Sequence, residues 1–323
     1  MKLFKFIFFA YLLWIPLLSC DTPSNDWKPF KVGTLLWVNE VMPDSIVKLA
    51  VKETLENSSL VVAQISWSPT DTIFLNNAQW YHLLAKESGA AFMLNIDWLE
   101  NDRADTRGNW DFENAEIKQL FIKDMKQLVD LYQPNYLTLG IEVNYYALTS
   151  PAGYNAFIKI YNDLKSYFKE NYPIIEVGLS FQLELLYGVH KGWNYNKTVE
   201  PLNAIVENLD YIGISTYPDI FYSTDKQTLF SVNYLDSLEK TYNKPMGISE
   251  TGISSINYND DERANYITGI YEKADDLNFE FVVWGSIIDD PRNDDWRHRL
   301  GLINFDGSYK SEFNIWKLQN KQK

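Results

Sequence analysis

The sequence predicts an α/β protein folded as a single (β/α)8 TIM barrel, and three observations support this. Eight short apolar segments rich in β-branched residues alternate with segments of helical spacing along the 323 residues. These units follow one another at nearly regular intervals, which favours a closed barrel over the runner-up, an open doubly wound sheet. No Gly-rich phosphate loop follows the first predicted strand, and no Gly-, Pro- or Ser-rich linker divides the chain. We therefore expect one domain, over residues 29–323.

The predicted strands are short apolar runs, as expected of parallel strands that are covered on both faces. They are expected at 31–37, 60–67, 91–98, 136–142, 174–181, 209–216, 244–250 and 280–285. The predicted helices show apolar residues at intervals of three and four. They are expected at 44–57, 77–88, 112–132, 151–171, 229–242, 260–277 and 312–318. Gly89 is suited to end the second of these helices, and Ser150 followed by Pro151 is suited to begin the fourth.

The composition argues against a nucleic-acid partner. The chain carries a net charge of −14 and contains no long run of lysine or arginine. Binding to nucleic acid needs a basic surface, so this class of partner is not expected. Aromatic residues make up 15% of the chain. They indicate either a large core or a surface on which flat rings stack against the apolar faces of sugars, so a carbohydrate is the expected partner.

The N-terminal segment has the pattern of an export signal. A short basic start is followed by an apolar run, and residues 17–20 read LLSC. This pattern resembles the lipobox of bacterial lipoproteins, which implies a signal peptide over 1–20, lipidation at Cys20 and a tether over 21–28. The protein is then expected outside the cytoplasm, attached to the outer membrane or cell surface through its lipid. An ordinary signal peptide or an N-terminal anchor helix is the alternative. Because Cys20 is the only cysteine, no internal disulfide is expected.

Two predicted strands end in a glutamate. Residues 136–144 (YLTLGIEVN) place Glu142 at the end of the fourth strand, and residues 244–252 (KPMGISETG) place Glu250 at the end of the seventh. The C-terminal ends of barrel strands form the active site in this fold. A charge beside a buried strand is costly unless it is paired or functional, so the two glutamates are expected either in salt bridges or as a catalytic pair. Glycoside hydrolysis needs two carboxylates, one to protonate the leaving oxygen and one to attack the anomeric carbon or activate water.

Aromatic and polar residues at or near the other strand ends are candidates for binding a sugar, with core packing as the alternative for the aromatic ones. These candidates are Trp37, Trp67, Asp97, Trp98, Asn144, Tyr217 and Trp284. His190 and Trp193 share a long loop and are candidates for shaping a subsite. No histidine or cysteine ends a predicted strand, which argues against a binuclear metal hydrolase. The acidic run 289–295 (DDPRNDD) is compatible with a calcium loop, but solvated acidic turns are far commoner, so no metal and no cofactor are expected.

The order of these residues resembles clan A of the (β/α)8 glycoside hydrolases, whose acid/base glutamate follows strand 4 and whose nucleophile follows strand 7. Within the clan, residues 214–218 (ISTYP) and 249–252 (SETG) are most similar to the endo-β-1,4-galactanases of family 53. The resemblance implies a retaining hydrolase of a β-linked polysaccharide or oligosaccharide, with Glu142 as acid/base and Glu250 as nucleophile. It also implies that Tyr217 hydrogen-bonds the nucleophile and that Glu142 keeps its proton through a raised pKa.

One position departs from the clan pattern. The clan usually has an asparagine immediately before the acid/base glutamate, where it binds the sugar 2-hydroxyl, and this chain has Ile141 there. Asn144 would lie on the same side as Glu142 if the strand continued, and is a candidate substitute. The alternative hypothesis is a non-catalytic glycan-binding lipoprotein on a degenerate glycosidase barrel. A third hypothesis is a surface lipoprotein that uses the barrel as a structural scaffold.

Overall fold

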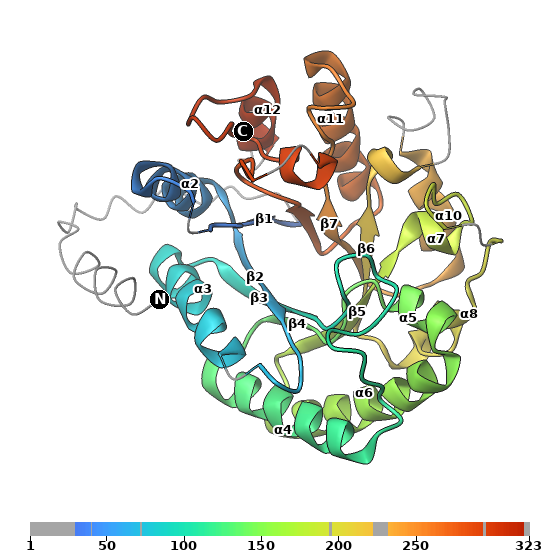
Figure 1. The fold of residues 1–323 in the computed structure, drawn as a ribbon. Coiled ribbons are helices and arrows are strands. Elements are labelled where there is room, and N and C mark those ends of the chain that lie inside the picture. Colours follow the sequence, from blue (N-terminus) through green and yellow to red (C-terminus); the bar gives the residue numbers. More distant parts are fainter. Residues whose placement is uncertain are drawn as a thin grey trace.

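The eight strands form one closed barrel in the order β1 to β8, and every neighbouring pair runs parallel (Figure 1). The chain closes where β1 meets β8, with Lys31 opposite Phe281 and Thr34 opposite Trp284. The prediction of a single (β/α)8 barrel is confirmed, and the open doubly wound sheet is wrong. The computed structural model describes residues 30–39, 41–71, 73–193, 196–221, 232–292 and 295–319.

The strands are short and buried. Their bounds are β1 Lys31–Leu35, β2 Leu60–Ser66, β3 Ala91–Asp97, β4 Tyr136–Thr138, β5 Glu176–Gln182, β6 Tyr211–Thr216, β7 Met246–Thr251 and β8 Phe281–Trp284. Each differs by only a few residues from its predicted range, because the apolar run that predicts a strand also determines where it can be buried.

The longer helices surround the barrel (Figure 1). The α-helices are α2 Asp44–Asn57, α3 Phe74–Ser88, α4 Ala115–Tyr132, α5 Val143–Thr149, α6 Pro151–Asn171, α7 Leu183–Leu186, α8 Glu200–Asn203, α10 Asp236–Thr241, α11 Asp260–Asp276 and α12 Ser311–Gln319. Four short 3-10 helices are η1 Val206–Asn208, η2 Pro218–Ile220, η3 Asn233–Leu235 and η4 Trp296–Arg299. The predicted caps are present: Gly89 follows α3 with φ 68°, and the Ser150 hydroxyl accepts the Gly153 N–H at 3.3 Å.

Two predicted elements differ from the structure. Strand β4 ends at Thr138, and residues Val143–Thr149 form helix α5 instead of a continuing strand. The helix predicted over 229–242 is replaced, within the described residues, by η3 and the short α10. The signal peptide, Cys20 and the tether lie outside the described residues, and so does the start of the 229–242 helix. No helix in the described part of the chain is long and apolar enough to cross a membrane.

The interior of the barrel changes from apolar to polar along its axis. A compact apolar cluster, separate from the main core, contains Leu35, Leu60, Val62, Met93, Tyr136, Tyr211, Phe281 and Val283. Because side chains alternate along a strand, the residues two positions further face the same interior. These are polar: Gln64 follows Val62, Asn95 follows Met93, and Thr138 follows Tyr136. This polar layer leads up to the strand ends where the two glutamates lie.

Candidate active site

Glu142 lies between an arginine and a serine. Its Oε1 accepts the Ser215 hydroxyl at 2.6 Å, and its Oε2 is 2.8 Å from Arg103 Nε. Glu142 precedes α5 with a left-handed backbone, φ 52°. A residue other than glycine adopts this conformation only when its surroundings enforce it, and such residues concentrate at functional sites. Both oxygens of the Glu142 carboxyl are therefore in polar contact with the protein.

Glu250 lies near the end of β7, on the same side of the barrel as Glu142. An irregular register sets Ile248 opposite Ile214 but Glu250 opposite Ser215, so Ser249 is an extra residue on β7. Neighbouring strands lie about 4.8 Å apart. Ser215 therefore stands beside Glu250 and also bonds Glu142, and the two glutamates predicted to be catalytic converge.

The pKa of Glu250 is raised to about 7. Burial of this carboxyl is the main cause, and the charge of Glu142 adds to it. A hydrogen bond from the Tyr217 hydroxyl and the charge of Arg103 act in the opposite direction. The hydroxyl of Tyr217 is therefore near enough to the carboxyl of Glu250 to act on its pKa. At slightly acid pH, Glu250 holds a proton in the free protein.

Arg103 is a central residue of the site that sequence reasoning does not single out. Its Nη1 is 2.7 Å from Asp97 Oδ1 while its Nε contacts Glu142. Burial alone would lower the pKa of Arg103, but the charges of Asp97, Glu142 and Glu250 raise it above its ordinary value. Arg103 lies in the loop between β3 and α4, where it has φ 64°. A loop has no periodicity from which the direction of this side chain could be predicted.

Asp97, a predicted substrate ligand, anchors that loop. Its carboxylate is paired with Arg103 and is 3.4 Å from Arg107 Nη2. It also accepts the Gln64 amide at 3.4 Å and the Leu99 N–H at 3.4 Å. These contacts hold the carboxylate of Asp97 toward the protein, so its visible role is to position Arg103.

Three of the four predicted tryptophans do not reach the site. Trp67, Trp98 and Trp284 are at most 1% exposed and belong to the main hydrophobic core. Trp67 donates to Asp124 of α4 at 3.0 Å. Trp98 and Trp284 donate to the backbone carbonyls of residues 139 and 300. The prediction that these rings bind sugar is wrong, because they face the helices and have no free surface on which a sugar could stack.

Trp37 is the tryptophan that remains a candidate. Its side chain is 42% exposed, and its indole N–H donates to the Gly285 carbonyl at 3.1 Å. That bond fixes the ring beside the ends of β1 and β8, at the edge of the barrel where the active site is expected. A fixed and exposed indole at this place is suited to stacking on a sugar ring.

Asn144 does not replace the missing asparagine. Its amide nitrogen donates to the Gln182 carbonyl at 2.9 Å, and its oxygen accepts the Gln182 N–H at 2.8 Å. Both ends of the buried amide are therefore used to tie α5 to β5. Ile141, at the position of the clan asparagine, is also buried. The prediction that Asn144 contacts substrate fails because residues 143–149 are helical.

Two side chains of the loop that follows β5, His190 and Trp193, contact Tyr145 of α5. Tyr145 Oη is 2.6 Å from His190 Nε2, and the Trp193 ring lies 4.9 Å from the Tyr145 ring. The Gly192 N–H donates to His190 Nδ1 at 3.0 Å, so Nδ1 is an acceptor. Burial lowers the pKa of His190 to about 4. A neutral His190 thus donates through Nε2 to Tyr145, three residues from Glu142, which places this loop beside the site.

The described residues contain no group of three or more His, Cys, Asp or Glu side chains that could hold a metal. In the acidic run, Asp289 pairs with Lys310 at 2.9 Å and Asp295 pairs with Arg297 at 2.7 Å. These carboxylates form ion pairs within the protein, as in a structural turn.

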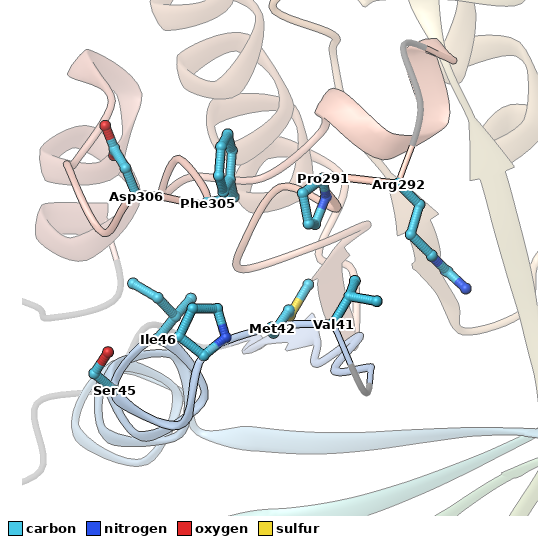
Figure 2. Close-up of a pocket in the computed structure, with 9 residues that line it drawn as sticks. Val41, Met42, Ser45, Ile46, Pro291, Arg292, Phe305 and Asp306 are labelled. Atoms are coloured by element: carbon cyan, nitrogen blue, oxygen red, sulfur yellow. The ribbon is translucent and has the colours of Figure 1, made fainter.

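A cavity of about 720 Å3 lies between the start of α2 and the segments that follow β8 (Figure 2). It is lined by Val41, Met42, Pro43, Ser45, Ile46, Pro291, Arg292, Phe305 and Asp306. Neither glutamate is among these residues. The cavity is therefore separate from the carboxylate pair, over which Arg103 is folded.

Several solved structures resemble this chain in fold. A family 39 glycoside hydrolase from Bacteroides cellulosilyticus has a TM-score of 0.64 at 13% identity, over 91% of this chain and 64% of that one. An exo-β-1,4-mannosidase from an Opitutaceae bacterium has a TM-score of 0.67 at 14% identity, over 93% and 62%. A family 17 β-1,3-glucanosyltransferase from Rhizomucor miehei has a TM-score of 0.57 at 16% identity, over 88% and 96%.

This chain therefore spans less than two thirds of the length of the first two proteins, and about all of the third. At these identities the likeness shows the fold alone, a (β/α)8 barrel. No protein-family model and no curated protein matches the chain.

Proposed function

We propose that this protein is a retaining glycoside hydrolase that acts on a β-linked polysaccharide or oligosaccharide. One observation carries the proposal: Glu142 and Glu250 converge on Ser215 at the C-terminal end of a closed barrel. This is the end at which active sites of the fold form. The fold-level likeness to glycoside hydrolases of several families supports the same proposal.

In the proposed mechanism, Glu250 attacks the anomeric carbon while Glu142 gives a proton to the leaving oxygen. The covalent glycosyl-enzyme is then hydrolysed by water, from which Glu142 takes a proton as Glu250 leaves. Tyr217 orients Glu250 and stabilises its ionised form through the hydrogen bond between them. Trp37 would support the sugar ring. The first candidate substrate is β-1,4-galactan, by the resemblance of residues 214–218.

A second candidate function is glycan binding without catalysis. The observation that favours it is the ion pair between Arg103 and Glu142, because it occupies a carboxyl oxygen that the acid would have to offer to the substrate. Ile141 and the fully used amide of Asn144 favour it too, since neither supplies the usual contact to the sugar 2-hydroxyl.

Release of reducing ends separates the two functions. The purified protein is offered β-galactan, β-mannan, β-glucan, xylan and arabinogalactan. Release from one polymer is expected to disappear in Glu250→Ala and to fall by about 10²–10⁴-fold in Glu142→Ala. Glu87→Ala, which removes an exposed glutamate on α3, is the matched control and should leave release unchanged. Tight binding of one polymer with no release from any would replace the hydrolase by the glycan-binding function.

We also propose that the protein is exported and lipid-anchored through Cys20, on the pattern of its first twenty residues. Cells that express it should incorporate labelled palmitate into the protein, and Cys20→Ser should abolish the label. Persistence of the label in the variant would contradict the anchor at this residue.

A further inference from the structure

The arginines of this chain are concentrated at one end of the barrel. The chain has six arginines and 23 lysines. Five of the six arginines lie in the segments that follow β3 and β8, and they are Arg103, Arg107, Arg292, Arg297 and Arg299. These segments leave the C-terminal ends of their strands, which is the proposed substrate side. Arginine differs from lysine in offering a planar fork that matches carboxylates and sulfates.

Arg103 has one fixed partner and one exchangeable partner. Asp97 is the fixed partner, because Arg107, Gln64 and the Leu99 N–H hold its carboxylate as well. Glu142 is the exchangeable partner, since it meets a different edge of the guanidinium, Nε, at 2.8 Å. The guanidinium can therefore stay on Asp97 while its Nε edge changes acceptor.

The proposed reaction requires that exchange. Glu142 must carry a proton to act as the acid, and a protonated carboxyl no longer offers the charge that Arg103 binds. With a neutral sugar, the Nε edge of this largely buried cation would face an uncharged carboxyl, and Asp97 and Glu250 would be the carboxylates that balance its charge. A carboxylate or sulfate on the sugar would take the place of Glu142 and form a charge-assisted contact of the same kind.

We propose that the site takes an anionic β-glycan, which bears carboxylate or sulfate groups, in preference to the neutral β-1,4-galactan that the resemblance suggests, and that Arg103 binds this group as it releases Glu142. The inference rests on the proposed function, because it assigns the substrate class of the same two glutamates. The overall charge of −14 does not oppose it, since exposed charges are screened beyond about 8 Å at physiological salt.

The test compares pairs of ligands that differ in charge alone. The pairs are 4-nitrophenyl β-glucuronide with the β-glucoside, oligomannuronates with their carboxyl-reduced forms, and a sulfated galactan with its desulfated form. Hydrolysis is measured as kcat/KM, and binding is measured by calorimetry at 0.1 M salt. Comparing the uronate pairs with the sulfated pair identifies which of the two anions the protein recognises. The proteins are wild type, Arg103→Gln, Arg103→Lys and, as the control, Lys52→Gln, which removes an exposed cation of α2 that pairs with Glu56.

For the wild type, we expect kcat/KM or affinity to be at least about tenfold higher on the anionic member of a pair than on the neutral one. This is the effect of one charge-assisted contact. Arg103→Gln should lose about tenfold to a hundredfold more on that member than on the neutral one. Arg103→Lys, which keeps the charge without the fork, should fall between, and Lys52→Gln should match the wild type. Equal thermal unfolding midpoints would show that the variants are folded.

Turnover that favours the neutral members would overturn the anionic substrate class and leave the hydrolase standing. Equal losses on both members in Arg103→Gln would also overturn it, by showing a purely structural arginine. Arg103-dependent binding of an anionic member without turnover would support the inference and refute the hydrolase. Absence of both turnover and charge-dependent binding would overturn the inference.

Discussion

The hydroxyl of Ser215 bonds one glutamate of the site, and Ser215 itself lies beside the other. The hydroxyl donates to Glu142 at 2.6 Å, and its residue is the strand partner of Glu250. Together with Arg103, this hydroxyl holds the carboxyl of Glu142 in place, while burial and the charge of Glu142 raise the pKa of Glu250 to about 7. Glu250 must be ionised for nucleophilic attack, so the free protein is ready for this step only above about pH 7.

The pH dependence of hydrolysis follows from the raised pKa of Glu250. Because Glu250 attacks in its ionised form and its pKa is about 7, kcat/KM is expected to rise as the pH increases through about 7. The charge of Arg103 lowers the pKa of Glu250, so Arg103→Gln should move this rise to higher pH. Tyr217→Phe should do the same by removing a hydrogen bond to the carboxylate. The profile is measured on the polymer that the protein hydrolyses.

The control for this profile is Lys52→Gln, which should leave its position unchanged. A rise centred near 4.5, the ordinary pKa of a glutamate, in both the wild type and Arg103→Gln would contradict the account of Glu250.

Single residues of the site were predictable only where strand order determines them. Glu142 and Glu250 follow from counting strands, because each ends or follows a buried apolar run. Trp67, Trp98 and Trp284 were misassigned, because a strand end does not reveal whether a ring faces the barrel mouth or the surrounding helices. Arg103 could not be predicted at all, since its position depends on the path of a loop.

Helix α5 decides the local geometry of the site. It begins directly after Glu142 and is tied to β5 by two hydrogen bonds between Asn144 and the backbone of Gln182. The sequence does not reveal this helix, because it is only seven residues long and Val143 and Tyr145 also fit an extended strand. The left-handed backbone at Glu142 is the point at which the chain leaves the strand direction.

A matched pair of asparagines tests the role of this connection. Asn144→Ala removes both bonds to Gln182, so the protein should lose about 1–3 kcal/mol of unfolding free energy more than in Asn95→Ala. Asn95 is equally buried, but neither atom of its amide has a hydrogen-bond partner among the described residues. The two losses are compared by urea unfolding. Equal losses, or a larger loss in Asn95→Ala, would contradict the account.

At the scale of the whole molecule, the sequence predicts the architecture well. Eight apolar strand segments at regular spacing are enough to predict a closed barrel, because parallel strands joined by helices must bury both faces of the sheet. The strand bounds follow from the same runs of apolar residues. The shape of the substrate side was not predictable, since it is made by loops such as the one that folds Arg103 over Glu142.

The account as a whole depends on Glu250 forming a covalent bond to the sugar. The most direct test is to incubate the protein with 2-deoxy-2-fluoro-β-glycosyl fluorides, including the glucuronosyl, glucosyl, galactosyl and mannosyl forms, and to measure its intact mass. The account predicts a mass increase of one fluorosugar that maps to the peptide carrying Glu250 and is absent in Glu250→Gln. A fluorosugar attached to another residue, or no attachment by a fluoride whose parent sugar the protein releases, would contradict the proposed mechanism.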